Sequence, residues 1–287
     1  MNVLVVRGKD MSKMTNRIKS KIYDIRIGKI NEKYIEEAML SGPILQEIEI
    51  ETLNRCNGKC SFCPVNVTQP QREYAKMSKE LFVKIIDELA ENDYEGKISL
   101  FSNNEPFLDE RIVEFHKYAR KALPKAKFNL FTNGSLLDLE KFKEIVECLD
   151  TFTIDNYNDD LEVNKGLKEV WNYINENESY KEKVNFSMRL ENEVLTSRGG
   201  YAPNKKKVRY QRTKCLLPYR QMVIRPDGKV SLCCNDALGK ITLGDVSKDT
   251  IYDIWNSEEY KKIRNEMMIN GRKNLTLCQR CDTRTSP

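Results

Sequence analysis

Short apolar segments alternate with amphipathic segments along most of the chain. Residues 44–51 largely alternate apolar and acidic side chains, which is the period of a strand. Residues 78–91 carry their apolar side chains on one helical face, and Ser78 is a suitable N-cap for this helix. The pattern then repeats, with strands predicted at 97–101, 127–131, 151–154 and 184–190, and helices at 139–148, at 161–174 and after Asp109, which can cap its helix.

Strands that alternate with helices of 10 to 15 residues predict βαβ units and a parallel sheet. In such sheets the ligands bind at the carboxyl ends of the strands. Five strands are visible in this region, fewer than the eight of a closed (β/α) barrel. The predicted fold class is therefore α/β, with an incomplete set of barrel strands.

The pattern differs on both sides of this region. The polar and basic N-terminal residues include a predicted helix near 31–40 that ends before a Gly-Pro break. Beyond the last strand, Gly199-Gly200 and a basic tract at 204–214 mark a boundary, and a hairpin at 222–233 and a helix at 250–268 follow. The expected organisation is an N-terminal extension at 1–43, an α/β domain at 44–200 and a smaller α+β lobe at 201–287.

Composition describes an ordinary globular protein. The 287 residues carry 48 Lys and Arg against 43 Asp and Glu, a formal net charge of +5, and 40% of them are hydrophobic. This is enough apolar material for a core, which excludes a disordered chain. No apolar stretch approaches the about 18 residues of a membrane helix or the apolar region of a signal peptide. The expected location is the cytoplasm, with no membrane partner.

Nine cysteines and a single histidine are the unusual counts. Disulfides are rare in the reducing cytosol, so these cysteines favour metal ligation or thiol chemistry. His116 lies within a helical pattern, where a solvated or half-packed side chain is expected. One histidine excludes most zinc sites built from histidines and the Ser-His-Asp triad. We therefore expect cysteine to carry the chemistry.

The first three cysteines, Cys56, Cys60 and Cys63, follow the first predicted strand. Their spacing, with Gly58 between them, allows three thiolates to converge on one centre, and a set of soft thiolates selects an iron-sulfur cluster or zinc. A structural zinc site would need a fourth local ligand, and no Cys or His follows within twenty residues. Three ligands leave one metal position open for a substrate or cofactor.

This CxxxCxxC loop resembles the hallmark of the radical S-adenosylmethionine (SAM) enzymes, whose fold is a partial (β/α) barrel. The resemblance implies that the three cysteines hold a four-iron cluster whose open iron binds SAM, and that Phe62 lies against its adenine. Asn103-Asn104-Glu105-Pro106 is similar to the family's Gly-Gly-Glu-Pro turn that holds the amino group of SAM, with two asparagines in place of two glycines. The same resemblance implies three further cofactor-binding residues: Asn133 in a Thr-Asn-Gly turn, Asp155 for the ribose and Arg189 for the carboxylate.

The C-terminal lobe resembles the reduced SPASM domain, also called twitch, which holds one auxiliary four-iron cluster. The implied ligands are Cys215, Cys233, Cys278 and Cys281, with Gly228 before the second of them. A full SPASM domain holds two clusters and needs more cysteines than are present. Two cysteines remain: Cys148, expected to be a packing residue, and Cys234, expected to point away from the auxiliary cluster and toward the active cavity, or else to be a small buried residue.

The resemblance also implies a reaction. A 5′-deoxyadenosyl radical formed from SAM would remove a hydrogen atom from a polar small molecule such as a sugar or cyclitol. Oxidation of a carbinol would leave one electron for the auxiliary cluster. Thr196-Ser-Arg198-Gly-Gly200 is similar to a segment of a dehydrogenase within the family, where the arginine contacts the substrate hydroxyl, so Arg198 is the candidate for that role. A one-electron donor such as flavodoxin or ferredoxin would reduce the first cluster.

Other functions stay open at this stage. A radical epimerase would use Cys234 to return a hydrogen atom, and a SPASM relative could modify a ribosomal peptide. A non-catalytic iron-sulfur or zinc protein would show no dependence on SAM. The basic residues of the tract, Lys205, Lys206, Lys207, Arg209, Arg212 and Lys214, would attract an anionic substrate if they border the cavity. The tract lacks the interleaved aromatics of a nucleic-acid platform, so nucleic acid is not an expected partner.

Overall fold

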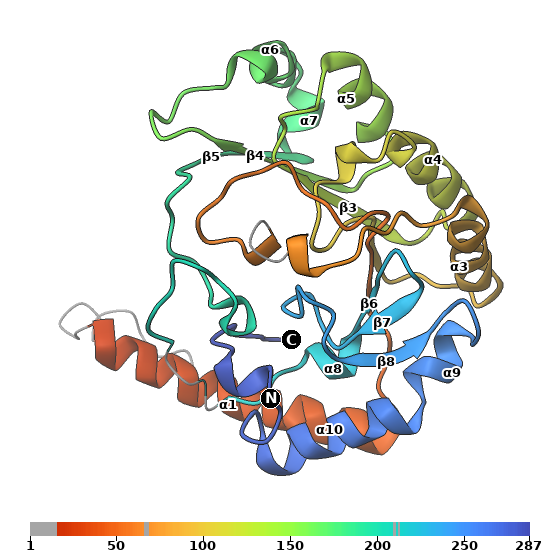
Figure 1. Cartoon of the computed structure of the whole chain (residues 1–287), viewed down its shortest axis with the longest axis vertical. Helices are drawn as coiled ribbons and strands as arrows, with labels where there is room; N and C mark the ends of the chain where they lie inside the picture. Colours follow the sequence, from red (N-terminus) through yellow and green to blue (C-terminus); the bar gives the residue numbers. More distant parts are fainter. Residues whose placement is uncertain (1–15, 66–68, 209–210, 212) are drawn as a thin grey trace.

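The computed structural model describes residues 16–65, 69–208, 211 and 213–287 (Figure 1). Arg209 and Arg212 of the basic tract lie outside the described residues. Within the described part of the chain, eight strands form one sheet in the order β5-β4-β3-β2-β1-β6-β7-β8. The sheet is open and mostly parallel, which confirms the predicted fold class.

The parallel part of the sheet contains one more strand than the sequence indicates. The strands β1 to β5 pair in parallel, and β6 pairs in parallel with the other side of β1, although 170 residues separate the two in sequence. The predicted hairpin is formed by β6 and β7, and β8 extends it in antiparallel fashion. The bounds are β1 Glu47–Ile50, β2 Lys97–Ser99, β3 Lys127–Thr132, β4 Thr151–Tyr157, β5 Val184–Arg189, β6 Gln221–Ile224, β7 Lys229–Ser231 and β8 Thr242–Asp245.

Helices follow the parallel strands and lie outside the sheet (Figure 1). Ser78 caps the first of them as predicted, because its side chain accepts a hydrogen bond from Leu81 N at 3.1 Å. Asp109 does not cap the next helix: Arg111 is its N-cap, and the Asp109 carboxylate instead binds the Arg111 guanidinium at 2.8 Å. These helices are α3 Lys79–Glu91, α4 Ile112–Ala122, α5 Leu139–Val146, α6 Lys168–Glu176 and α7 Glu178–Lys181.

Two predicted helices have different bounds. The helix expected at 161–174 begins only at Lys168, after the short helix η3 Lys165–Leu167, because Leu161 has a positive φ of 55° that no α-helix accommodates. The helix expected at 250–268 is two helices, since Ser257 starts a new one by capping Tyr260 N. The remaining elements of the C-terminal half are η4 Arg198–Gly200, α8 Leu217–Arg220, α9 Ile251–Trp255, α10 Glu258–Asn270 and η5 Cys278–Arg280; η1 Gln69–Gln71 and η2 Pro106–Leu108 precede them.

The N-terminal helix α1 Asn16–Ser41 is longer than the predicted 31–40 and lies beside α10 (Figure 1). Its Asn31 is fully buried and donates hydrogen bonds to Lys214 O at 3.0 Å and Thr285 O at 2.9 Å. Trp255 Nε1 also donates to Pro43 O at 2.7 Å. The extension is therefore packed against the C-terminal half of the chain. No described helix has the length and apolar character needed to cross a bilayer.

Two single residues test the expectations about packing. His116 is fully buried rather than solvated or half-packed, with Nδ1 2.8 Å from Ile112 O. Burial lowers the pKa of His116 to about 4, so its ring is neutral at physiological pH. Cys148 is buried just beyond the end of α5, which confirms its predicted packing role.

Candidate active site

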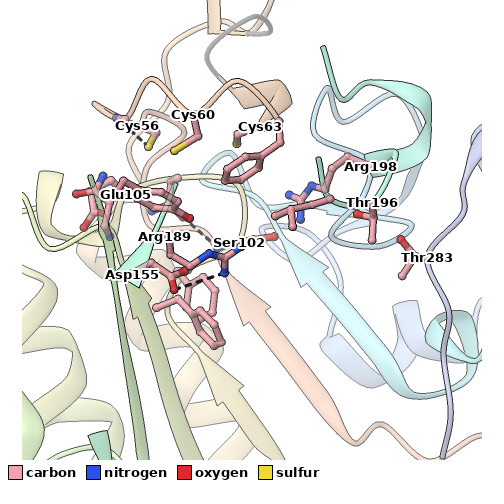
Figure 2. A pocket seen from close by; sticks show the side chains of 18 of the residues that line it. Cys56, Cys60, Cys63, Ser102, Glu105, Asp155, Arg189, Thr196, Arg198 and Thr283 are labelled. Atoms are coloured by element: carbon pink, nitrogen blue, oxygen red, sulfur yellow. Dashed lines mark hydrogen bonds and ion pairs between the residues drawn. The ribbon is translucent and has the colours of Figure 1, made fainter. Parts of the chain in front are cut away.

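A cavity of about 940 Å³ lies at the carboxyl ends of the parallel strands. This is near the upper end of the range for small-molecule sites. The loops after β2 and β3 and the carboxyl ends of β4 and β5 line it together with the cysteine loop 56–63 (Figure 2). Ten of the predicted site residues line this cavity: Cys56, Cys60, Phe62, Cys63, Asn104, Glu105, Asn133, Asp155, Arg189 and Arg198.

The cysteine loop brings three thiols to one wall of the cavity. Cys56 Sγ accepts a hydrogen bond from Gly58 N at 3.3 Å. A Cβ on Gly58 would lie 3.4 Å from Cys56 Sγ and 3.7 Å from Cys60 Sγ, so the loop curls closely around its own sulfurs. Burial raises the pKa of Cys56 to about 12 and that of Cys60 to about 11, and the neighbouring thiols add to both shifts.

These thiols fit a multi-iron cluster with one open position. Soft thiolate donors select such clusters, and a bound metal deprotonates its thiol ligands despite a raised pKa. Among the described residues, no three His, Cys, Asp or Glu side chains are arranged to hold a single metal ion. Phe62 lies beside the loop, with its ring centroid 5.9 Å from that of Tyr157.

Glu105 ties the β2 and β3 loops together. Its buried carboxylate accepts hydrogen bonds from Thr132 Oγ1 at 2.7 Å, Asn133 N at 2.8 Å and Phe107 N at 3.1 Å. Burial raises the pKa of Glu105, and these hydrogen bonds oppose the shift. Asn104 also faces the cavity, and its Nδ2 is buried without a hydrogen-bond partner among the described residues. An unpartnered buried donor beside a carboxylate fits a polar ligand.

Asn103 does not line the cavity. It is buried, its Oδ1 accepts a hydrogen bond from Arg198 at 2.7 Å, and its Nδ2 donates to Cys234 O at 3.1 Å. Asn103 therefore connects the β2 loop to the C-terminal lobe, whereas Asn104 faces the predicted cofactor region.

Asp155 and Arg189 lie at the carboxyl ends of β4 and β5, with Asp155 inside its strand rather than after it. Arg189 Nη1 is 3.6 Å from Asp155 Oδ1 (Figure 2), and the same guanidinium is hydrogen bonded to Glu193. Burial raises the pKa of Asp155, while the Arg189 charge opposes the shift. Both polar groups thus face the cavity in fixed positions.

The Arg198-Gly199-Gly200 segment has three consecutive positive φ angles, 48°, 65° and 84°. A Cβ on Gly199 would lie 2.4 Å from Leu277 Cδ1 and 3.1 Å from Asn235 O, so this position requires glycine. Arg198 itself is a non-glycine residue in a left-handed conformation, which is uncommon and concentrated at functional sites. The segment holds the Arg198 guanidinium at the cavity wall, with Nε buried and unpartnered among the described residues.

Glu49 is a functional candidate that sequence analysis missed. It lies on β1, where its Oε1 accepts a hydrogen bond from Gln221 Nε2 at 3.0 Å and its Oε2 is buried without a partner among the described residues. Burial raises the pKa of Glu49 to about 7, although the nearby Ser102 hydroxyl and the charge of Arg198 lower it. Ser102 lines the cavity, so it links Glu49 to that space.

Four further cysteines come together in the C-terminal lobe. Cys215, Cys233, Cys278 and Cys281 are all buried. Burial raises the pKa of Cys278 to about 12, and the nearby Cys215 and Cys281 thiols contribute to the shift. Four thiols in one buried group fit a cluster that is fully ligated by protein.

Arg272 is a second residue that sequence analysis missed. It is fully buried and donates hydrogen bonds to Thr213 O at 2.9 Å, Cys281 O at 3.3 Å and Thr283 O at 2.8 Å. Its charge also lowers the pKa of Cys215, against the larger effect of burial. A cation beside four thiolates compensates their negative charge.

Cys234 is not among the residues that line the cavity. Burial raises the pKa of its thiol, and the charges acting on it come from Glu49 and Arg198 as well as from the Cys215 and Cys281 thiols. These charges indicate that the side chain is near Glu49, Arg198 and the auxiliary group of cysteines, and its direction toward the cavity stays a prediction.

Comparisons with known proteins agree with this geometry. The radical SAM superfamily matches residues 50–185, and SPASM, an iron-sulfur cluster-binding domain, matches residues 215–282. The S-adenosyl-L-methionine-dependent 2-deoxy-scyllo-inosamine dehydrogenase of Niallia circulans is 25% identical over 238 residues, covering 82% of this chain and 92% of that protein.

Solved structures share the fold. The crystal structure of BtrN in complex with AdoMet and 2-DOIA has a TM-score of 0.72 and 24% identity, covering 85% of this chain and 95% of that chain. Native anSMEcpe with bound AdoMet has a TM-score of 0.51 and 15% identity, over 76% and 82% of the two chains. The chain is homologous to a dehydrogenase, and SAM and iron-sulfur clusters are the cofactors of its two domains. It carries a radical SAM domain at residues 50–185 and a C-terminal SPASM domain at residues 215–282.

Proposed function

We propose that the protein oxidises one hydroxyl-bearing carbon of a small polar molecule, such as a cyclitol or a sugar. The observation that carries the proposal is a group of three side chains: Ser102 and Arg198 line the cavity, and both influence the carboxylate of Glu49. The curated relative, whose name describes a dehydrogenase of 2-deoxy-scyllo-inosamine, supports this class of substrate.

The cofactors would be held by residues of the cavity wall and of the C-terminal lobe. Cys56, Cys60 and Cys63 would bind the first cluster. Phe62, Asn104, Glu105, Asn133, Asp155 and Arg189 surround the space for SAM, and Asn103 supports this wall from behind. Cys215, Cys233, Cys278 and Cys281 would bind one auxiliary cluster. When bound, these groups supply a 5′-deoxyadenosyl radical that takes a hydrogen atom and a cluster that takes one electron.

The chain itself must remove the hydroxyl proton. An alcohol oxidised to a carbonyl loses two electrons and two protons, and a hydrogen atom accounts for one of each. Arg198 faces the cavity and would donate a hydrogen bond to the substrate oxygen, which favours its deprotonation. Ser102 would pass the proton to Glu49, whose pKa is raised by burial to about 7 and thus suits a base at neutral pH.

Three further parts of the proposal concern the electron donor, the cellular location and the domain bounds. The first cluster would receive its electron from a donor such as flavodoxin or ferredoxin. We place the enzyme in the cytoplasm, since seven of its nine cysteines are proposed cluster ligands and disulfides are rare in that reducing compartment. The domain bounds would be 1–43, 44–200 and 201–287, with the second and third units sharing one sheet through β1 and β6.

Formation of 5′-deoxyadenosine tests the proposal. The protein is reconstituted anaerobically, reduced with dithionite and given SAM with a panel of cyclitols and sugars. We expect 5′-deoxyadenosine from the native protein and none from Cys60→Ala. Cys148→Ala is the matched control, because it removes a buried thiol remote from the cavity and should leave the product unchanged.

The products then separate the proposal from its alternative. A ketone formed in one-to-one ratio with 5′-deoxyadenosine supports oxidation. Solvent deuterium in a product of unchanged oxidation level, lost in Cys234→Ala, would instead indicate epimerisation. Protein with filled clusters that never forms 5′-deoxyadenosine contradicts the proposal.

A further inference from the structure

Different parts of the chain line the two ends of the cavity. The cysteine loop and the loops after the parallel strands line one end, where the proposed function requires SAM. Figure 2 shows Arg198, Thr196 and Thr283 on a different side of the cavity from the cysteines and Asp155. We call this side the tail end, because the C-terminal tail contributes to it. Its described lining residues are Leu195, Thr196, Arg198, Lys205, Gln211, Asp282, Thr283 and Arg284.

The tail end carries an excess of positive charge. Its described lining residues include the cations Arg198, Lys205 and Arg284 and one carboxylate, Asp282; Asp24 pairs with Arg284 from behind the wall, which leaves one positive charge in excess. Lys205 Nζ lies 2.6 Å from Asp282 Oδ2 and donates to Leu195 O at 2.6 Å, so the ammonium is fixed in place. One member of the basic tract therefore does border the cavity, whereas its neighbours Lys206 and Lys207 are exposed.

Arg284 is held by the N-terminal helix. Its Nη2 lies 2.9 Å from Asp24 Oδ1, and its guanidinium lies over the ring of Tyr23, 5.4 Å from the centroid. Neither residue of α1 lines the cavity. The tail around Arg284 is fixed as well, since Thr285 O accepts a hydrogen bond from Asn31 at 2.9 Å. The helix thus sets the position of a cation in the cavity wall.

We infer that the tail end binds an anionic group of the substrate, a phosphate or a carboxylate, through Lys205 and Arg284. The inference rests on the proposed function and narrows its substrate to an acidic or phosphorylated polyol. An ammonium has three donors and a guanidinium five, so the pairs with Asp282 and Asp24 are compatible with a further acceptor. The neighbouring Thr196 and Thr283 add hydroxyl donors for the remaining oxygens.

Matched ligand pairs test the inference in the native protein. Binding to the protein loaded with both clusters and SAM is measured by anaerobic equilibrium dialysis. myo-Inositol 1-phosphate is compared with myo-inositol, and glucuronate with glucose. We expect at least one charged ligand to bind about ten times more tightly than its neutral partner, since a charge-assisted hydrogen bond contributes about this factor. Whichever pair shows the difference identifies the anion.

Variants assign the effect to the tail end. Arg284→Gln and Lys205→Gln should each remove most of the difference within the pair, and Arg284→Lys should restore part of it. Lys168→Gln, which removes one exposed charge on α6, should leave it unchanged. Equal affinities within both pairs, or a difference that survives in both Gln variants, would overturn the inference.

The two proposals fail in different ways. Formation of 5′-deoxyadenosine by the native protein is measured in the same preparations. If 5′-deoxyadenosine forms and the charged ligands bind no more tightly than their neutral partners, the substrate is neutral or cationic. The proposed oxidation of a hydroxyl-bearing carbon then stands. If 5′-deoxyadenosine is absent while the anions bind selectively, the tail end is an anion site of a protein with another activity.

Discussion

Glu49→Gln is the substitution that most directly tests the proposed route of the hydroxyl proton. The substitution keeps the shape of the side chain and its contact with Gln221, and removes its capacity to accept a proton. Loss of a general base slows a reaction by about 10²- to 10⁴-fold. We therefore expect substrate oxidation to slow by this factor, while Glu47→Gln, on the same strand, leaves it within about twofold.

The pH dependence follows from the raised pKa. Burial raises the pKa of Glu49 from 4.5 to about 7, and a base must be ionised to accept a proton. The native kcat/KM should therefore rise with pH through about 7 and then level off, since this parameter reports the free enzyme. The profile of Glu49→Gln should be flat in this range.

Stability gives a second readout of the same group. When the pKa of a carboxyl group is higher in the folded than in the unfolded protein, the free energy of unfolding falls as the pH rises from the unfolded-state pKa to the folded-state pKa. For Glu49 this interval runs from 4.5 to about 7 and corresponds to about 3 kcal/mol. The free energy of unfolding of Glu49→Gln should therefore exceed that of the native protein by up to about 3 kcal/mol at pH 8, and match it near pH 4.

Chemical denaturation of both proteins at the two pH values measures this difference. A variant that is no more stable at pH 8 than at pH 4, relative to the native protein, would refute the burial argument. An unchanged rate of oxidation would refute the role of Glu49 as base, whatever the stability.

Three further predictions concern the C-terminal lobe. Gly199→Ala should lower the free energy of unfolding by about 1–3 kcal/mol in chemical denaturation, because its Cβ would meet Leu277 at 2.4 Å; no loss would contradict the glycine requirement. Arg272→Met should make the reduction potential of the auxiliary cluster more negative, by tens of millivolts in an EPR-monitored titration, while Arg272→Lys keeps it nearer the native value; equal potentials would exclude a role for this charge. Asn31→Ala should cost about 2 kcal/mol of unfolding free energy, since it removes two buried hydrogen bonds, and an unchanged denaturation midpoint would show that α1 is not anchored there.

The features that the sequence made predictable are those with local patterns. The spacing of Cys56, Cys60 and Cys63 is itself the geometry of a converging loop, and hydrophobic period alone located β1 to β5. The hairpin of β6 and β7 was predicted from its local pattern, but the pairing of β6 with β1 was not, because it joins segments 170 residues apart and leaves no local signal.

Glu49 illustrates why the rest of the site was not predicted from the sequence. Alternating apolar and acidic side chains suggest a strand with one face in water. In this sheet Ile48 and Ile50 pack into the core, Glu49 on the other face is half-buried, and Glu51 is fully buried and pairs with Arg72 at 2.6 Å. The acidic positions themselves were the available signal, since a carboxylate on an interior strand position needs a partner or a function.

The pairing of β6 with β1 also has a mechanical consequence. The cysteine loop follows β1 and Cys233 follows β7, so the backbones that carry these two sites leave strands of one hydrogen-bonded sheet that are joined through β6. Relative movement of the two sites would break ladder hydrogen bonds. The separation of the two sites is thus set by the hydrogen bonds of the sheet, and any opening needed for substrates to enter falls to the loops and the tail.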